Sequence, residues 1–134
     1  MKRFSSWPLW ACLLTTAAGC RGVVTTQHAC TGSIEHALEI RVEDALTGAP
    51  IAEDAIAVAR EGAFSEQLRV VRWMPSGPGR VATTLGGVDE RPGTYGVEIQ
   101  LSGYARWDTT AVRVRKGPCH VETARMVARL QRLP

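Results

Sequence analysis

Hydrophobic and polar residues alternate along several short stretches of the chain, the pattern typical of half-buried β-strands. Residues 36–44, HALEIRVED, place Leu38, Ile40 and Val42 on one face. The charged residues between them fall on the other face: Glu39, Arg41 and Glu43. The same reasoning predicts strands within residues 54–62, 65–74, 80–87, 94–104, 106–117 and 119–131. Turns rich in Gly and Pro, such as PSGPG at 75–79 and DERPG at 89–93, separate them.

The clearest alternation lies in residues 94–104, TYGVEIQLSGY, where Tyr95 and every second residue after it point inward. A buried tyrosine needs a hydrogen-bond partner for its hydroxyl, so we expect Tyr95 to bond to the backbone.

Three of the other segments are less regular. Residues 53–60 also permit a helix, but their short length and strand neighbours favour a strand with Ile56 and Val58 on one face. Residues 80–87 fit a short or edge strand. In residues 119–131 the period changes, and a bulge near Ala124 would shift the inward positions to Met126, Ala128 and Leu130.

About seven short strands joined by Gly/Pro turns predict an all-β fold, a single antiparallel, immunoglobulin-like β-sandwich. The sequence shows no internal repeat, and the length left after the leader described below suits one domain.

The first nineteen residues have the character of an export signal. Lys2 and Arg3 give a basic start, residues 7–18 carry no charge, and small residues precede Cys20. The apolar run is too short to span a bilayer, which takes about 20 residues.

The end of this run, AAGC at 17–20, resembles the lipobox of bacterial lipoproteins. That resemblance implies that residues 1–19 are a lipoprotein signal peptide, that Cys20 carries the acyl chains and that residues 20–33 tether the domain to a membrane. Arg21, rather than Asp, follows the cysteine, which in that family favours the outer membrane of the bacterial cell envelope. An ordinary signal peptide cut near Ala18 or Gly19 remains the alternative, with a free thiol at Cys20.

Removing the leader changes the charge balance. The chain has 16 basic and 13 acidic residues; without Lys2 and Arg3 the excess falls to one positive charge. The short basic cluster of Arg113, Arg115 and Lys116 has no interleaved aromatic residues, so no nucleic-acid partner is expected.

The export signal also affects how the four cysteines are interpreted. Cys12 lies in the leader and Cys20 is the acylated residue if the lipobox resemblance holds, which leaves Cys30 and Cys119 in an oxidising compartment. We expect them to form a disulfide. Two free thiols are an alternative, as is a metal site with His28 and His120, although H-x-C and C-H are poor versions of the usual zinc spacing.

Two stretches resemble the carboxypeptidase regulatory-like family, whose domains have a transthyretin-like (prealbumin-type) sandwich. The first is LEIRVEDALTGAPI, with the family's D-x-x-T-G-x-P-I turn from Asp44 to Ile51; the second is GTYGVEIQLSGYARWDTTAVRV, with G-x-Y at 93–95 and Gly103-Tyr104. The resemblance implies such a domain over residues 34–131, with a structural or binding role.

An enzyme is not expected. The chain carries no G-x-S-x-G, H-E-x-x-H or phosphate-binding loop, and it lacks the C-terminal Tyr-Arg-Gly-Ser of the transthyretin-like hydrolases. His36, His120 and Glu122 could in principle form an acid–base set, but exposed strand residues are the simpler interpretation. No cofactor or metal is expected.

The sequence therefore predicts a non-catalytic, lipid-anchored accessory domain of the cell envelope, with a structural or protein-interaction role. The alternative is a carbohydrate-binding module facing peptidoglycan or a surface glycan. The expected partners of the chain are the membrane, through the lipid anchor, and an envelope protein or glycan. Candidate binding residues are the aromatic side chains Trp73, Tyr104 and Trp107, each of which could instead pack in the core.

Overall fold

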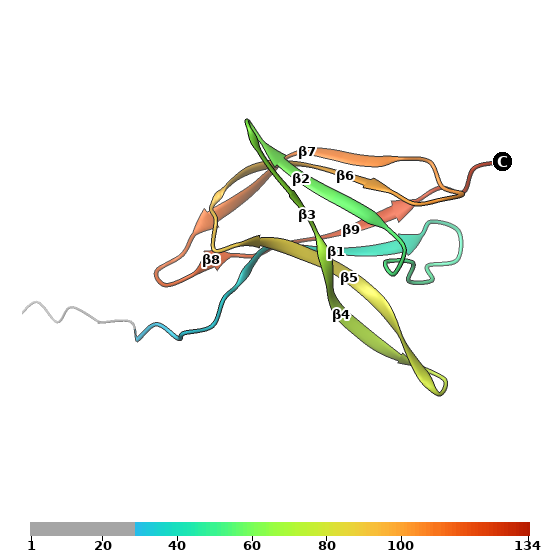
Figure 1. The fold of residues 1–134 in the computed structure, drawn as a ribbon, viewed down its shortest axis with the longest axis horizontal. Helices are drawn as coiled ribbons and strands as arrows, with labels where there is room; N and C mark the ends of the chain where they lie inside the picture. Colours follow the sequence, from blue (N-terminus) through green and yellow to red (C-terminus); the bar gives the residue numbers. More distant parts are fainter. Residues whose placement is uncertain (1–28) are drawn as a thin grey trace, which may run out of the picture.

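The fold is a β-sandwich of two packed sheets (Figure 1). The structure, a computed structural model, describes residues 29–134. One sheet has four strands in the order β4-β5-β1-β9, and the other has five in the order β3-β2-β6-β7-β8. The strands of the described residues are β1 His36–Asp44, β2 Ile56–Glu61, β3 Phe64–Gln67, β4 Arg69–Ser76, β5 Gly79–Asp89, β6 Gly93–Gln100, β7 Trp107–Lys116, β8 Val121–Glu122 and β9 Ala124–Leu130.

The predicted alternation in β1 and β6 is confirmed and builds the core between the sheets. Tyr95 is fully buried, and its hydroxyl donates a hydrogen bond to the Arg91 carbonyl at 2.9 Å, as expected for a buried phenol. This link to the backbone four residues upstream resembles the tyrosine corner of immunoglobulin-type sandwiches. The side chains that alternate inward from these two strands and are buried are Leu38, Ile40, Val42, Tyr95, Val97 and Ile99.

Nine strands form where about seven were expected, because two segments cross from one sheet to the other. Residues 65–74 divide at Leu68, which is buried and donates its backbone N–H to the Ala57 carbonyl at 2.8 Å. The residues before it pair with β2 and those after it pair with β5. The chain thus changes sheets within a segment that the pattern predicted as one strand.

The second crossing lies between β8 and β9. The break is at Thr123, one residue before the predicted bulge, and the shifted inward set of Met126, Ala128 and Leu130 is confirmed. Strand β9 then pairs with β1 in parallel, from Leu38 against Ala124 onward. The sandwich is therefore not wholly antiparallel.

Two further strands differ from the expectation. Strand β5 is not an edge but lies between β4 and β1, and it is longer than the predicted segment. A Cβ on Gly86 would lie 2.8 Å from a Val71 methyl group, so only glycine lets the Val71 side chain pack this closely against β5. In β2 the inward residues are alanines, Ala57 and Ala59, whereas Ile56 is 55% exposed. Small side chains suit this position because the large Ile99 and Val97 of β6 stand opposite them in the register.

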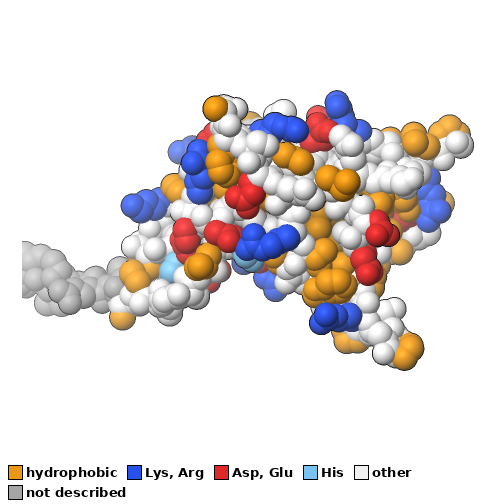
Figure 2. All heavy atoms as spheres, viewed as in Figure 1, with side chains coloured by type: hydrophobic (Ala, Val, Ile, Leu, Met, Phe, Trp, Pro, Cys, Tyr) orange, Lys and Arg blue, Asp and Glu red, His pale blue; other side chains and the backbone are white. Residues whose placement is uncertain are grey.

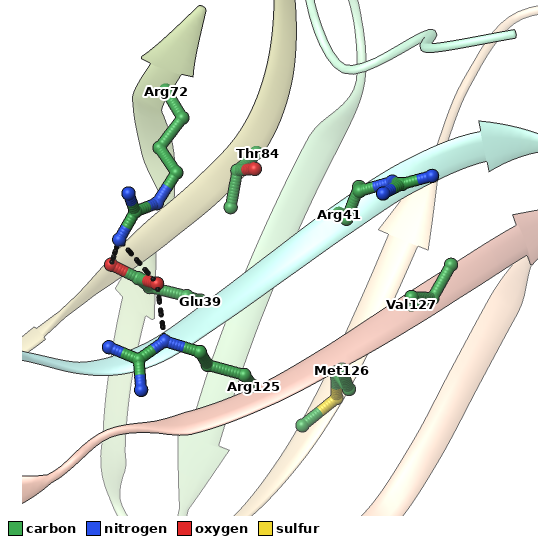
Figure 3. A pocket seen from close by; sticks show the side chains of 7 residues that line it. All are labelled: Glu39, Arg41, Arg72, Thr84, Arg125, Met126 and Val127. Carbon is green, nitrogen blue, oxygen red and sulfur yellow. Dashed lines mark hydrogen bonds and ion pairs between the residues drawn. The ribbon is translucent and has the colours of Figure 1, made fainter.

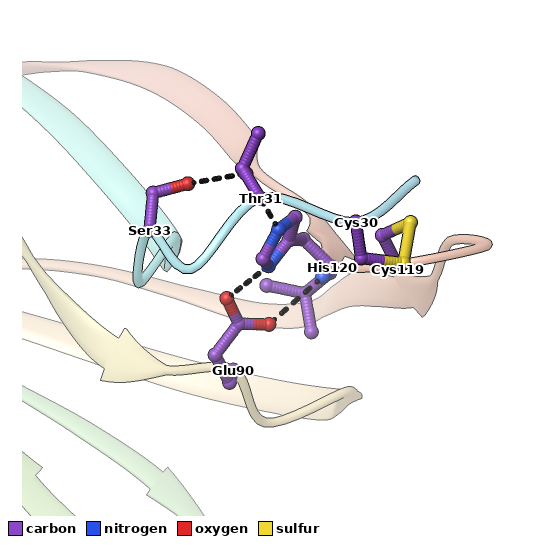
Figure 4. The surroundings of a disulfide bond; sticks show 7 residues. Cys30, Thr31, Ser33, Glu90, Cys119 and His120 are labelled. Carbon is purple, nitrogen blue, oxygen red and sulfur yellow. Dashed lines mark hydrogen bonds and ion pairs between the residues drawn. A yellow bond between two sulfur atoms is a disulfide. The ribbon is translucent and has the colours of Figure 1, made fainter. Parts of the chain in front are cut away.

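The predicted disulfide is confirmed: Cys30 is bonded to Cys119, 89 residues later in the chain, with their Cα atoms 5.3 Å apart. It joins the start of the described chain to the connection between β7 and β8 (Figure 4). The C terminus lies at the opposite end of the sandwich (Figure 1).

The cross-link predicts a large stability difference between oxidised and reduced protein. Closing a loop of this length restricts the unfolded chain by roughly 4 kcal/mol in the chain-entropy model. Replacing both cysteines, Cys30→Ser with Cys119→Ser, should lower the free energy of unfolding by about that amount in urea titrations. Reductant should destabilise the wild type to the same extent and leave the double variant unchanged. Equal stability of the two oxidised proteins would show that the bond does not constrain the unfolded chain.

Candidate functional site

A buried carboxylate, Asp44, organises the end of the sandwich away from the disulfide. Its side chain is 1% exposed, and it accepts backbone N–H bonds from Leu46 and Thr47, both at 2.9 Å. Tyr104 donates its hydroxyl at 2.8 Å and Arg132 its Nε at 2.6 Å to the other oxygen. One carboxylate thus joins the end of β1, the loop before β7 and the C-terminal segment.

These contacts explain the aspartate that begins the turn singled out by the sequence. The backbone N–H of Thr47, then the Tyr104 hydroxyl, lowers the pKa of Asp44 well below its ordinary range. The hydrogen bond from the Tyr104 hydroxyl to Asp44 also raises the pKa of Tyr104. Gly48 has a φ of 70°, a backbone conformation that glycine adopts without strain, and its N–H bonds to the Asp44 carbonyl at 2.8 Å.

Of the three aromatic candidates, Trp73 is the most exposed. It lies on β4, is 41% exposed, and the Arg80 guanidinium stacks 4.8 Å from its ring centroid. The β4–β5 hairpin that carries it projects from the body, with hydrophobic side chains gathered near the hairpin's base (Figures 1 and 2).

The other two aromatic residues are partly buried and pack against the core. Trp107 begins β7, opposite Ile99, and Tyr104 is held by Asp44. Trp73 and Trp107 belong to different sheets, so the structure does not bring the three candidates into one aromatic surface.

Residues 29–134 contain two histidines, and each contacts a carboxylate of its own; His120 follows Cys119 of the disulfide (Figure 4). His120 contacts Glu90 at 2.6 Å through Nδ1 and the Thr31 hydroxyl at 3.1 Å through Nε2. His36 contacts Asp89 at 2.5 Å. A backbone N–H from Glu35, which outweighs the effect of burial, and the His120 side chain lower the pKa of Glu90.

Glu122 is not part of this cluster. Within residues 29–134, no hydrogen bond or ion pair joins it to His36 or His120, so the three residues do not form a set. The same part of the chain holds no group of three or more His, Cys, Asp and Glu side chains placed to bind a metal. His28 and Cys20 lie outside the described residues.

A cluster of charged side chains lies on the outer side of the four-stranded sheet (Figure 3). Glu39 of β1 accepts hydrogen bonds from Arg72 of β4, whose Nη2 reaches both carboxylate oxygens at 2.8 and 2.9 Å, and from Arg125 of β9 at 3.0 Å. Burial opposes the ionisation of Glu39, but the hydrogen bonds from the two arginines outweigh it and lower its pKa.

Four residues further along β1, Glu43 also contacts two arginines. It pairs with Arg41 of its own strand and with Arg129 of β9, the latter at 3.7 Å. Its side chain is 6% exposed, whereas that of Arg129 is 70% exposed. The carboxylates are therefore covered and the guanidinium groups face solvent.

We call this surface, formed by Arg41, Arg72, Arg125 and Arg129 over Glu39 and Glu43, the arginine face. It contains a depression of about 410 Å³. Guanidinium groups donate planar pairs of hydrogen bonds to carboxylate, phosphate and sulfate groups, so such a surface can bind anions. The side chains that line the depression are Glu39, Arg41, Arg72, Thr84, Arg125, Met126 and Val127.

No protein-family model and no curated protein matches this chain. The site is therefore interpreted from its own geometry. No helix in residues 29–134 has the length and apolar character that a membrane span requires.

The Asp44 contacts predict a specific loss of acid stability. Because its pKa is lowered in the folded protein, ionised Asp44 stabilises the fold at neutral pH, and that contribution is lost as the pH falls below about 4. Asp44→Asn should lower the melting temperature at pH 7 and reduce the fall in stability between pH 5 and pH 2, values chosen to bracket the ordinary aspartate pKa of about 3.9. The exposed Asp54→Asn variant serves as a control and should follow the wild type; a parallel acid profile for Asp44→Asn would contradict the assignment.

The two tryptophans should respond differently to truncation. Trp73→Ala removes an exposed ring and one cation–π contact, so the free energy of unfolding should fall by less than about 1 kcal/mol. Trp107→Ala removes a ring packed against the core, and we expect a loss of about 2–3 kcal/mol. Denaturant titrations of both variants measure this difference. Equal losses would mean that Trp73 is part of the core.

Proposed function

We propose that the chain is a non-catalytic, lipid-anchored accessory domain of the bacterial cell envelope, with a structural or protein-interaction role. The observation that carries this proposal is the Cys30–Cys119 disulfide. Disulfides persist in oxidising compartments, in agreement with the export signal in residues 1–19. The signal and the proposed lipid-bearing Cys20 lie outside the described residues, and the outer membrane is the proposed location.

We also propose that the fold is the prealbumin-type sandwich of carboxypeptidase regulatory-like domains. Support comes from the contact between the two stretches that resemble that family. Asp44, from the D-x-x-T-G turn, accepts the hydroxyl hydrogen bond of Tyr104, from the G-Y pair, 60 residues later. Residues from the two separate stretches that resemble the family therefore form one polar cluster.

A role without catalysis agrees with how the polar side chains are used. His36 and His120 each contact a separate carboxylate, and the Tyr104 hydroxyl donates a hydrogen bond to Asp44. The arginine face offers hydrogen-bond donors over covered carboxylates, an arrangement that suits binding.

The proposed tether determines which end of the domain is close to the membrane. Cys30 is ten positions after Cys20, and Thr31 already contacts Ser33 and His120. The part of the proposed tether that precedes the disulfide is therefore shorter than residues 20–33, and ten extended residues reach about 35 Å at most. The disulfide end lies next to the anchor, and the Asp44 end lies away from it.

A carbohydrate-binding module is the second candidate. The exposed Trp73 on the projecting hairpin is the observation that favours it, because an exposed ring can stack on a sugar.

The anchor can be tested in the native host. With Cys20→Ser, the protein should move from the membrane fraction to the soluble fraction, and the intact mass of the wild type should equal residues 20–134 plus acyl chains. Cys12→Ser, which lies in the leader, is the matched control and should leave the membrane fraction unchanged. An unacylated wild-type mass would remove the lipid anchor and the envelope role that depends on it.

A further inference from the structure

We propose that the arginine face binds an anionic polysaccharide, a linear sugar polymer that carries carboxylate, phosphate or sulfate groups. This inference deepens the proposed function, on which it rests for the location of the ligand. The binding itself follows from the contacts of the face.

The first argument is the separation of charge within the domain. Of the chain's 16 basic residues, Lys2, Arg3 and Arg21 precede the described domain, which leaves 13 basic against 13 acidic residues. The domain is neutral as a whole, yet the arginine face has four guanidinium groups and two carboxylates. Attraction of an anion to this surface is thus a local property and not an effect of net charge.

The second argument is the number of donors that the face leaves available. A guanidinium group has five N–H donors. Arg72 uses Nη2 and Arg125 uses Nε on Glu39, and residues 29–134 contain no other hydrogen bonds or ion pairs from these two side chains. Both side chains are more than half exposed. Glu39 therefore holds each group in place while further donors face solvent.

The third argument is the spacing along β1. Glu39 and Glu43 are four residues apart on the same side of the strand, a distance on the order of 13 Å. Each carboxylate holds two guanidinium groups, so two cationic positions follow one another along the strand. A single small anion meets one of them, whereas a polymer with repeated anionic groups lying along β1 meets both.

The lining of the depression favours a sugar polymer over other polyanions. Thr84, Met126 and Val127 complete its surface, and its lining includes no aromatic ring on which a nucleobase could stack. The carboxylate of Glu39 forms part of a hollow. A flat bilayer surface does not enter such a hollow, whereas a narrow chain does.

Binding of the purified full chain to immobilised dextran sulfate and to alginate, at increasing salt concentrations, tests the proposal. We expect saturable binding to at least one of them, weakened by salt, and none to uncharged dextran. Arg72→Ala with Arg125→Ala should reduce the affinity at least tenfold. The matched control, Arg113→Ala with Arg115→Ala, removes the same charge from exposed positions of β7 and should stay within twofold of the wild type.

A second variant keeps the test valid if the double substitution unfolds the domain. Glu39→Gln leaves all four arginines, removes one covered negative charge and keeps a side-chain oxygen that accepts hydrogen bonds from Arg72 and Arg125. It should therefore bind the anionic polymer more tightly, by about two- to fivefold, if the arginine face is the site. Weaker binding or no change would overturn the proposal, provided that thermal melts show a folded variant.

Three further outcomes would also overturn it: equal loss in both double variants, absence of wild-type binding to both anionic polysaccharides, and preferential binding to vesicles containing anionic phospholipid or to duplex DNA. The measurement uses protein in solution and does not depend on acylation. Failure of the anchor at Cys20 and failure of the arginine face are therefore separate results.

Discussion

The carboxylate of Asp44 closes one end of the sandwich. It is almost completely buried, and its two oxygens accept hydrogen bonds from backbone N–H groups, a phenol and a guanidinium group. A buried charge is tolerated only when it is this fully bonded. Because the donors come from the turn after β1, from Tyr104 and from Arg132, these three segments keep their positions together. The disulfide performs the corresponding task at the opposite end.

Local alternation was enough to find most strands, because burial on one side of a sheet produces a period of two in any strand with one solvent-exposed face. It could not find the crossings at Leu68 and Thr123. A residue pattern records which side of a strand is buried, and it does not record which sheet supplies the neighbouring strand. The same limit hid the parallel pairing of β9 with β1, whose partners are 86 residues apart.

The candidate sites show this limit more strongly. Searching for aromatic side chains found Trp73, Tyr104 and Trp107, which the structure places apart. The arginine face was missed because its members come from three strands; Glu39 meets Arg72 across 33 residues and Arg125 across 86. The alternation of acidic and basic residues in β1, together with the outward arginines of β9, was the available signal. Only the register of the four-stranded sheet turns those separate patterns into one surface.

The parallel pairing of the first and last strands has a consequence for the order of folding. Strand β1 cannot gain its neighbour on that side until β9 has been synthesised. Arg132, which completes the Asp44 cluster, arrives later still. Contacts between such distant residues must overcome a large loss of chain entropy before they contribute stability, so the transition to the native state depends on nearly the entire chain. Closure of the sandwich therefore uses strands from both ends of the domain.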